Sequence, residues 1–339
     1  MVRFAVVGVN HNHIYGMTDA LLAAGAELAM FHAAEPDLSA EFGQRYPQAK
    51  AVELAAVLEA PDVQLVASAA ISNERGPLGI DVMRHGKDFF SDKPAFTDLD
   101  VLEEARRVQR ETGQFFAISY SERISNKAMV KAAELVQAGA IGRVLQTVGL
   151  GPHRLNRPTR PAWFFEKQRY GGIITDIGAH QADHFLHFTG STSFEIVCSQ
   201  IGNLAHPDDP ELEDFGDVVV RGDGGSGYFR VDWFTPDGLA AWGDGRFTIL
   251  GTDGTIEVRK NMGRDGDAGG SYLFLVDQTG QRFVDCSQVD LPHGRLFLDD
   301  LRNRTETSMT QAHAFLASEL ALRAELQAAD ITRKPQSVA

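Results

Sequence analysis

The sequence predicts an α/β protein with an amino-terminal, doubly wound parallel sheet and a carboxyl-terminal α+β domain built on a large open, mainly antiparallel sheet. Three observations predict this fold class. Strand-like apolar runs alternate with helical stretches in the first part of the chain, which is the pattern of βαβ units. The later part is rich in strand-like segments separated by turns such as GDGGSG and GTDGT. The length of 339 residues is too great for one typical core.

The first domain is expected to contain five principal strands, because short apolar runs bounded by turn residues are typical of strands buried on both faces. The expected strands are Arg3–Gly8, Glu27–Ala33, Val63–Ser68, Asp88–Ser91 and Phe115–Ser119. Helices are expected between Asn10 and Gly25, around Leu38 and Phe42, before Gly86, over Asp98–Glu111 and over about Ser125–Ala138. The segment Val52–Asp62 is interpreted as a connection.

The second domain is expected to be an antiparallel sheet, because its candidate strands are joined by glycine-rich turns. The candidate strands are Val144–Gly149, Phe194–Ile201, Asp217–Arg221, Gly227–Phe234, Phe247–Leu250, Thr255–Arg259, Tyr272–Val276 and Gln281–Asp285. We therefore expect a nucleotide-binding domain over residues 1–122 and a second domain over 123–310. An amphipathic carboxyl-terminal helix, Thr310–Ala328, lies in 311–339 and is expected to pack back on the first domain.

The composition excludes several classes of function. The net charge of −14 and the pI near 5.2 argue against nucleic-acid binding, which needs a basic face. The two cysteines, Cys198 and Cys286, are too few for a disulfide framework or a thiolate zinc site. No leader peptide and no membrane-spanning run is recognised, so a cytoplasmic protein without a membrane partner is expected.

The stretch Gly171–Gly190 carries the most unusual polar pattern in the chain. At about 100° per residue, Asp176, His180, Asp183 and His187 fall within an arc of about 60° on a helix, opposite a run of isoleucine and phenylalanine side chains. Such a face can present carboxylates and imidazoles to a cleft. A solvated surface face explains the pattern equally well. A zinc site at His180 and His184, four residues apart, is a further alternative.

A second candidate site follows the first strand, where a dinucleotide would bind. The sequence from Gly8 to His13 keeps only the first glycine of the usual G-x-G-x-x-G fingerprint. Asn10 can adopt the backbone geometry of the second glycine, whereas His13 occupies the third position and could reach a phosphate or the substrate. Glu35 ends the second strand, where an acidic residue would accept hydrogen bonds from ribose hydroxyls, although it could equally be an ordinary loop residue.

The motifs resemble a known family when they are taken together. In this order, the glycine turn, GKDFFSDKPAF, GAIGRV and GGIITDIGAHQAD resemble the Gfo/Idh/MocA oxidoreductases, the family of glucose-fructose oxidoreductase and inositol dehydrogenase, over nearly the whole chain. GKDFFSDKP resembles the family segment G-K-H-V-x-x-E-K-P with Asp92 in place of glutamate, which implies that Lys93 is the catalytic lysine. GGIITDIGAHQAD resembles the G-G-G-x-x-x-D-x-G-x-H-x-x-D motif, which implies that Asp176 and His180 are the paired catalytic residues.

The resemblance implies a Rossmann-type first domain and a nicotinamide cofactor, with NAD favoured over NADP because no arginine or lysine immediately follows Glu35. The implied cofactor contacts are Gly8, Asn10, His11, His13, Glu35, Asn73, Asp92 and Lys93. The family's Pro-x-x-x-His element near the nicotinamide ribose is replaced here by Ala70–Arg75. Candidate substrate contacts are Arg123, Trp163 and Asp183, although a surface ion pair for Arg123 and simple packing for Trp163 are as plausible. No metal is expected.

The expected reaction is NAD-dependent oxidation of a secondary hydroxyl of a sugar, polyol or related carbohydrate, or the reverse reduction. His180 would act as the general base, Lys93 would polarise the same oxygen, and Asp176 would bind a neighbouring hydroxyl or orient the imidazole. A homodimer or homotetramer formed through the second sheet is expected. Two other functions remain open, namely an NAD-dependent glycoside hydrolase of the same family and a non-catalytic sensor of nucleotide or sugar.

Overall fold

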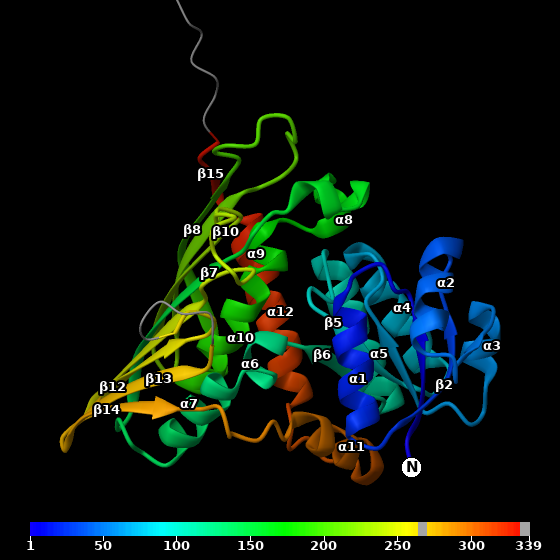
Figure 1. Cartoon of the computed structure of the whole chain (residues 1–339), viewed down its shortest axis with the longest axis horizontal. Coiled ribbons are helices and arrows are strands. Elements are labelled where there is room, and N and C mark those ends of the chain that lie inside the picture. The colour runs from blue at the N-terminus through cyan, green and yellow to red at the C-terminus, as the bar shows by residue number, and fades with distance from the viewer. Residues whose placement is uncertain (264–269, 333–339) are drawn as a thin grey trace, which may run out of the picture. The chain divides into compact units, whose positions relative to one another are not determined.

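The computed structural model describes residues 1–263 and 270–332, and the chain divides into two compact units (Figure 1). The first unit consists of Met1–Tyr120, Arg169–Gly171 and Pro292–Phe315, and the second of Ser121–Gln168, Gly172–Leu291 and Leu316–Ala339. The segment Pro292–Phe315 thus belongs with the first unit although it follows the strands of the second. In the ranges that the structure describes, no helix is both long enough and apolar enough to cross a bilayer.

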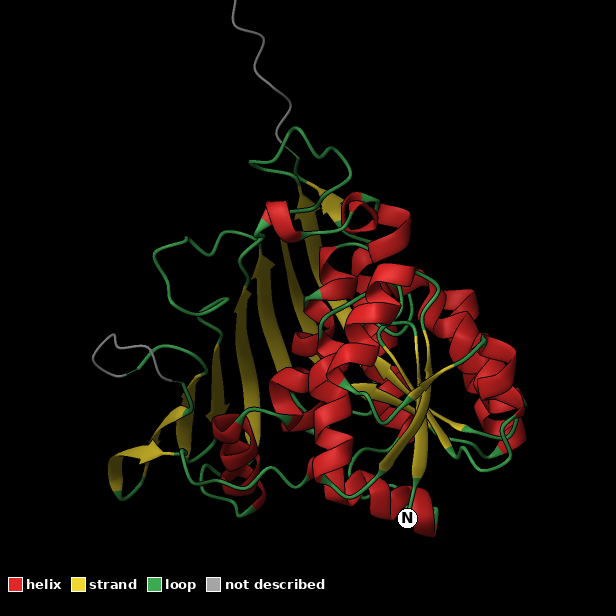
Figure 2. Ribbon diagram, turned by 45° about the vertical axis from the view of Figure 1, so that its right-hand side comes forward, coloured by secondary structure: helices red, strands yellow, loops and turns green. Residues whose placement is uncertain are grey.

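The described residues of the first unit form a six-stranded parallel sheet in the order β3-β2-β1-β4-β5-β6. This order confirms the predicted doubly wound fold, whose topological switch point lies between β1 and β4. Helices cover both faces of the sheet (Figure 2). Every residue of β4 and β5 is buried, as expected for strands covered on both faces of a parallel sheet.

The elements of the first unit follow one another as alternating strands and helices. The strands are β1 (Arg3–Val7), β2 (Glu27–His32), β3 (Lys50–Ala51), β4 (Leu65–Ser68), β5 (Asp88–Asp92) and β6 (Phe116–Ser119). The helices are α1 (His13–Ala23), α2 (Pro36–Arg45), α3 (Leu54–Glu59), α4 (Ser72–Arg84), α5 (Leu99–Thr112) and α11 (His293–Asn303). The expected strands and helices are therefore present, but the segment interpreted as a connection contains β3 and α3.

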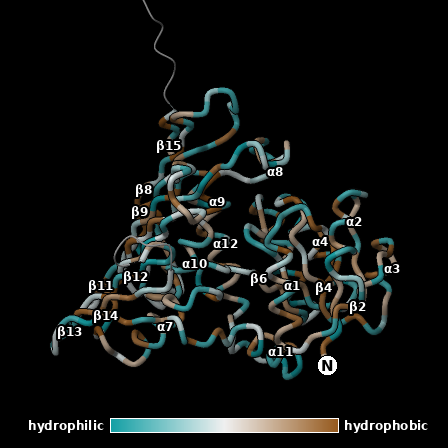
Figure 3. The backbone as a smooth tube through the Cα atoms, in the orientation of Figure 1, coloured by the Kyte–Doolittle hydropathy of each residue, from teal (hydrophilic) through white to brown (hydrophobic). Residues whose placement is uncertain are grey.

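The described part of the second unit forms a nine-stranded, mostly antiparallel sheet in the order β14-β13-β12-β11-β7-β10-β9-β8-β15. Its strands are β7 (Val144–Pro152), β8 (Phe194–Gly202), β9 (Phe215–Gly222), β10 (Ser226–Asp232), β11 (Arg246–Gly251), β12 (Gly254–Arg259), β13 (Tyr272–Asp277), β14 (Gly280–Asp285) and β15 (Ala329–Asp330). Only the pairs β7 with β10 and β8 with β15 are parallel. Every strand expected from the sequence overlaps an observed strand, and both hydrophilic and hydrophobic segments occur along the sheet (Figure 3).

Helices pack on one face of this second sheet (Figure 1). The helical segments are α6 (Ser121–Ile124), α7 (Lys127–Gln137), η1 (Arg157–Thr159), η2 (Ala162–Phe165), α8 (Lys167–Tyr170), α9 (Ile173–Asp176), α10 (Gly178–Thr189) and α12 (Gln311–Leu326). The core between α7, the end of α10 and the sheet contains Met129, Phe188, Phe247 and Ile256. The start of α12, to Phe315, belongs to the first unit and its remainder to the second.

A buried carboxylate organises the segment that follows α11 in the first unit. Asp300 is buried and accepts hydrogen bonds from the hydroxyls and amides of the loop that follows, at 2.6–2.9 Å from Thr305, Thr307 and Ser308. Burial by itself would raise the pKa of Asp300, but these hydrogen bonds, those from Ser308 first among them, lower it to about 2. The ionised carboxylate therefore stabilises this loop.

Asp300 predicts a defined acid sensitivity. Because its folded-state pKa is below the unfolded value of about 3.9, its contribution is present above pH 4 and is lost as the pH falls towards 2. We expect Asp300→Asn to reduce the free energy of unfolding by about 1–3 kcal/mol at pH 7 and by roughly half as much at pH 3. Urea unfolding of both proteins at the two pH values tests this, and an equal loss at both values would contradict it.

Candidate active site

The turn after β1 is built around Gly8, which has a φ of +75°. A Cβ atom at this position would lie 2.5 Å from the Cβ atom of Ala70, so only glycine fits between the ends of β1 and β4. The amide of Gly8 donates to the carbonyl of His32 at 3.0 Å, and its carbonyl accepts from the amide of Ala69 at 3.1 Å. The backbone is thus held at the carboxyl ends of the strands, where ligands of such sheets bind.

Two of the predicted cofactor residues meet beside this turn. The side-chain amide of Asn10 donates to Oε1 of Glu35 at 2.8 Å, and both side chains are half-buried. Asn10 therefore orients the carboxylate of Glu35, which was expected to end the second strand but lies after β2 as the N-cap residue of α2. One carboxylate can accept several hydrogen bonds, so Glu35 retains capacity for the hydroxyls of a ligand.

Two histidines after β1, His11 and His13, turn towards the end of β5, and His13 stands at the position of the third glycine of the fingerprint. His13 Nδ1 lies 2.9 Å from Oδ1 of Asp92, and His11 Nδ1 lies 3.6 Å from Oδ2. The buried guanidinium of Arg75 lies 3.3 Å from the same Oδ2. Burial alone would raise the pKa of Asp92, but His13, Arg75 and His11 together hold it well below its usual range. The carboxylate that replaces the family's glutamate is therefore ionised and held by basic groups.

Lys93 follows Asp92 directly and is buried. Its carbonyl accepts a hydrogen bond from Arg75 Nη1 at 2.7 Å, and that of Pro94 accepts from the same nitrogen at 3.1 Å. Arg75 also donates through Nε to the carbonyl of Ala70 at 2.7 Å. The loop Ala70–Arg75 is thus tied to the end of β5 by one guanidinium. Asn73 belongs to this segment and lies in the first turn of α4, which begins at Ser72.

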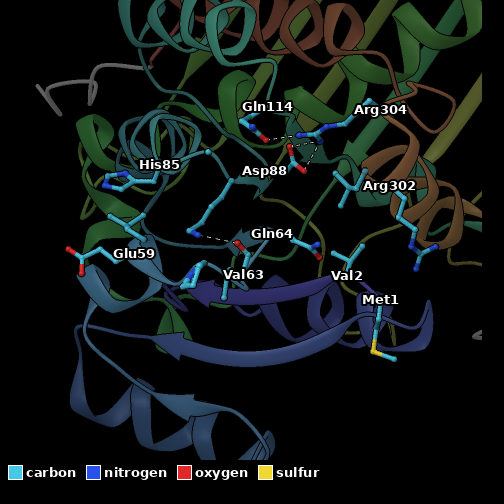
Figure 4. Close-up of a pocket in the computed structure, with 15 residues that line it drawn as sticks. Met1, Val2, Glu59, Val63, Gln64, His85, Asp88, Gln114, Arg302 and Arg304 are labelled. Carbon is cyan, nitrogen blue, oxygen red and sulfur yellow. Dashed lines mark hydrogen bonds and ion pairs between the residues drawn. The ribbon is translucent and has the colours of Figure 1, made fainter.

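The first unit has a cavity at the amino-terminal ends of its strands, away from the carboxyl-terminal edge where Gly8 lies (Figure 4). Its volume is about 600 Å³. Lys87 donates to the carbonyl of Val63 at 3.1 Å, and Asp88 accepts two hydrogen bonds from Arg304 at 2.8 and 2.9 Å. Because protein groups satisfy these buried charges, we assign them to stability and not to ligand binding.

In the second unit, the glycine pair of GGIITD marks the close approach of two carboxylates to the start of α9. Glu213 accepts from the amide of Ile173 and Glu325 from that of Ile174, both at 2.9 Å. Lys167 forms ion pairs with both carboxylates. Burial, followed by the charge of Glu213, raises the pKa of Glu325. The two acids cap α9 and so position Asp176 at its end.

Gly172 is predicted to be essential to this arrangement. Its φ is +95°, and a Cβ atom there would lie 2.2 Å from the carboxyl carbon of Glu325. We expect Gly172→Ala to lower the free energy of unfolding by more than about 2 kcal/mol. The alanine would have a strained positive φ, and its methyl group would clash with the buried carboxyl group of Glu325. Gly139→Ala is the matched control, since Gly139 has a φ of +78° with open space around it. Thermal unfolding would contradict the prediction if both variants lost the same stability.

The predicted catalytic pair lies on consecutive helices. Asp176 ends α9, His180 lies in the first turn of α10, and both side chains are buried. The predicted continuous helix is thus interrupted at Ile177. Asp183 and His184 are also buried, whereas His187 is exposed, so the solvated-face interpretation is wrong for the first two and right for the third. Asp176 also acts electrostatically on Arg160, whose pKa burial lowers and Asp176 raises.

A group of buried charges adjoins this pair within the second unit. Arg123 donates to both oxygens of Asp183 at 2.7 and 2.8 Å, so the suggested surface ion pair of Arg123 is in fact a buried one. Lys260 donates to Glu122 at 2.5 Å, and His153 Nε2 lies 3.6 Å from the other oxygen of Glu122. Burial would raise the pKa of Glu122, but Lys260, His180 and His153 hold it well below its usual range.

Burial followed by the charge of Lys260 keeps the pKa of His184 well below its usual value. This histidine is therefore neutral at physiological pH. Neither of its buried ring nitrogens forms a hydrogen bond with the described residues. Burial without such a bond is costly unless water or a ligand supplies one, so His184 marks a polar region that a ligand could complete.

The aromatic loop before α9 is packed more tightly than its sequence suggests. Trp163 is buried, with its ring centre 6.0 Å from that of Phe164. The guanidinium of Arg160 lies 4.4 Å from the centre of Phe164 and 5.1 Å from that of Trp233. Packing thus accounts for Trp163, and the loop contributes Arg160, which the sequence analysis did not single out.

Comparisons with known proteins identify relatives of both parts of the chain. Residues 129–257 match the model of the GFO/IDH/MocA C-terminal domain. A 133-residue stretch is 26% identical to D-xylose dehydrogenase of Paenarthrobacter nicotinovorans, covering 38% of this chain and 34% of that enzyme, so the match spans about a third of the curated relative. The crystal structure of a candidate oxidoreductase from Erwinia carotovora atroseptica SCRI1043 is 44% identical, with a TM-score of 0.95 over 98% of this chain and 100% of that chain. Levoglucosan dehydrogenase in complex with NADH and levoglucosan shares the fold, with a TM-score of 0.81, 16% identity and 96% of each chain covered.

Proposed function

The chain belongs to the GFO/IDH/MocA family of oxidoreductases, and we propose on this premise that it oxidises a secondary hydroxyl of a sugar, polyol or related carbohydrate with a nicotinamide cofactor, or catalyses the reverse reduction. The observation that carries the proposal is the gathering of Gly8, Glu35 and Lys93 at the carboxyl ends of strands of one parallel sheet. That edge is where dinucleotides bind in sheets of this topology. The enzymes named among its relatives act on carbohydrates.

The residues at this edge fit a dinucleotide. Gly8 brings the backbone close to the ligand position, and Glu35, oriented by Asn10, would accept the ribose hydroxyls. His11 and His13 would lie beside the pyrophosphate, with Asn73 and Asp92 near the nicotinamide end. When bound, the nicotinamide ring accepts or delivers the hydride. A carboxylate at the ribose disfavours a 2′-phosphate, so we propose NAD as the cofactor.

Glu35 supplies a direct prediction of nucleotide preference. Replacing it with serine removes the negative charge that would repel the 2′-phosphate of NADPH. We expect the ratio of the Kd for NADPH to that for NADH to fall by roughly tenfold, which corresponds to about 1.4 kcal/mol. Fluorescence titration of the two proteins with both nucleotides measures this ratio. An unchanged ratio would remove Glu35 from the ribose site.

The proton and the developing charge are assigned to three residues. We propose that His180 removes the hydroxyl proton in the oxidation direction, since imidazole titrates near neutral pH. Lys93 would donate a hydrogen bond to the same oxygen and stabilise its negative charge. Asp176, held at the end of the capped helix α9, would bind a neighbouring hydroxyl.

The proposed substrate contacts are refined by the packing of the second unit. Arg123 and Asp183 bind one another, so we propose that this pair positions α10. Direct polar contacts would come instead from His184 and from Glu122 Oε1, whose buried atoms form no hydrogen bond with the described residues. Trp163 would then form an apolar wall of the site. A cluster with both carboxylate and cationic groups suits a ligand with several hydroxyls, because hydroxyls both donate and accept hydrogen bonds.

We further propose that two or four copies associate through the second sheet. In the described residues, the face of this sheet away from α10 carries partly exposed apolar side chains on β11, β13 and β14, namely Leu250, Val276 and Phe283. Such a face is typical of a subunit contact. Light scattering during size-exclusion chromatography measures the assembly mass, and a monomer at all concentrations would exclude this proposal.

The decisive experiment is titration with NADH and NADPH, followed by a screen of sugars and polyols with the preferred nucleotide. Binding of a nucleotide and turnover of a carbohydrate hydroxyl support the dehydrogenase. Release of sugar from a glycoside without net NADH formation would establish the hydrolase alternative. Nucleotide binding with no turnover of any class would favour the sensor. Failure to bind either nucleotide overturns the proposal.

A further inference from the structure

We propose that His11, His13 and Asp92 form a binding site for a divalent transition-metal ion in the first unit. The donor atoms of the three side chains lie within 4.8 Å of one another. They come from the turn after β1 and from the end of β5, so the fold gathers them from positions 79 residues apart. No metal was expected from the sequence, where the one metal alternative considered was zinc at His180 and His184.

The distances suit coordination by one small cation. Ligand atoms at the 2.0–2.1 Å bond lengths of Zn²⁺ stand about 3.3 Å apart in a tetrahedral arrangement. His13 Nδ1 lies 2.9 Å from Oδ1 of Asp92, and His11 Nδ1 lies 3.6 Å from Oδ2. These two separations lie on either side of that value, and all three donor atoms lie within 4.8 Å of one another.

The acceptor atoms at this point lie beside one positive charge, since Arg75 is 3.3 Å from Asp92 Oδ2. The amide of His13 donates to His11 Nδ1 at 3.3 Å, so this ring nitrogen is an acceptor. It faces Asp92 Oδ2, a buried oxygen that accepts no hydrogen bond from the described residues. Two acceptors therefore face one another across 3.6 Å with no proton between them. A metal ion here would replace the His13 amide at the lone pair of His11 Nδ1 and would share Asp92 Oδ2 with Arg75.

Arg75 has the position of an outer partner to such a site. Its guanidinium lies 3.3 Å from Asp92 Oδ2 and is fixed by the carbonyls of Ala70, Lys93 and Pro94. Groups of this kind orient a ligating carboxylate. The positive charge of Arg75 also opposes the metal, so the site is expected to bind moderately and to release its ion to strong chelators.

The donor set indicates the class of metal. Two imidazoles with one carboxylate suit Zn²⁺, Fe²⁺, Mn²⁺ or Co²⁺, whereas Mg²⁺ and Ca²⁺ prefer sites made only of oxygen. Three protein ligands leave coordination positions for water or a ligand oxygen. His11 and His13 are partly exposed while Asp92 is buried, so the open positions are reached from the solvent side.

Metal binding is tested on the full-length protein after dialysis against EDTA, without any nucleotide. We expect calorimetric titration with ZnCl₂ to show one site per chain, and Co²⁺ to give a visible absorption band of a low-coordinate complex. His11→Asn and His13→Asn should each weaken binding by at least tenfold, whereas His85→Asn, which removes an exposed histidine of the same unit, should not. Circular dichroism checks that the variants fold.

Absence of saturable Zn²⁺ and Co²⁺ binding overturns the proposal, as does binding that is unchanged in both His11→Asn and His13→Asn. Since Asp92→Asn could disturb Arg75, the two half-exposed histidines carry the test. The metal-site proposal does not depend on the oxidoreductase function. If the protein bound Zn²⁺ at this site but bound no nucleotide, the metal site would stand and the proposed nicotinamide cofactor would be excluded.

Discussion

Replacing His180 with asparagine is expected to lower kcat for the carbohydrate substrate by about 10²–10⁴-fold, the range that a positioned general base contributes. Asparagine preserves the approximate size of the buried side chain but cannot take up the hydroxyl proton. Because the base acts on substrate and not on the nucleotide, the Kd for NADH should remain within about twofold of the wild-type value. Steady-state kinetics in the oxidation direction and nucleotide titration measure the two effects.

The matched control is His187→Asn, which alters an exposed histidine on the same helix. It should leave kcat unchanged. A loss of kcat in His180→Asn alone would then come from the missing imidazole at position 180 and not from a general disturbance of α10. Lys93→Met is the companion variant, with an expected loss of about 10²–10³-fold from removal of a charged donor to the reacting oxygen. If both His180→Asn and Lys93→Met turned over the substrate at the wild-type rate, the catalytic assignment would be wrong.

The fold was largely predictable because both sheets leave strong local patterns. The strand Arg3–Val7 is largely buried and has an almost continuous apolar sequence. The strands β9 and β10 are joined by a glycine-rich turn, which is typical of an antiparallel hairpin. The helix α3 was missed because it has only six residues, too few for a helical period to repeat. The strand β15 has two residues, too few for any periodicity.

The residues of the candidate site could be predicted only where they belong to one local sequence motif. Lys93, Asp176 and His180 belong to local patterns, whereas Glu122 and Lys260 are 138 residues apart and meet only in the folded sheet. Periodicity placed Asp183 on one face of a helix, but it could not show that packing also covers that face. Likewise, His13 only departs from the glycine fingerprint when the sequence is read alone. Its contact with Asp92, 79 residues away, forms only because the fold brings the end of β5 near the residues that follow β1.

Removing the guanidinium of Arg123 is expected to have the largest effect on stability. Arg123→Met takes away the two hydrogen bonds that Asp183 accepts in a fully buried position. Breaking a buried ion pair on one side typically costs about 3–5 kcal/mol, because the desolvated charge that remains loses its compensation. Urea unfolding of the two proteins at pH 7 measures the difference, which should appear as a lower midpoint.

Arg221→Met is the control for this prediction, since Arg221 pairs with Glu195 at 3.0 Å on the exposed surface of the same unit. Water already solvates both of its charges, so the variant should lie within about 0.5 kcal/mol of the wild type. Adding Asp183→Asn to Arg123→Met removes the charge left behind and should recover part of the loss, because the penalty comes mainly from burial of that charge. A double variant less stable than Arg123→Met would show instead that Asp183 stabilises α10 through contacts other than this ion pair.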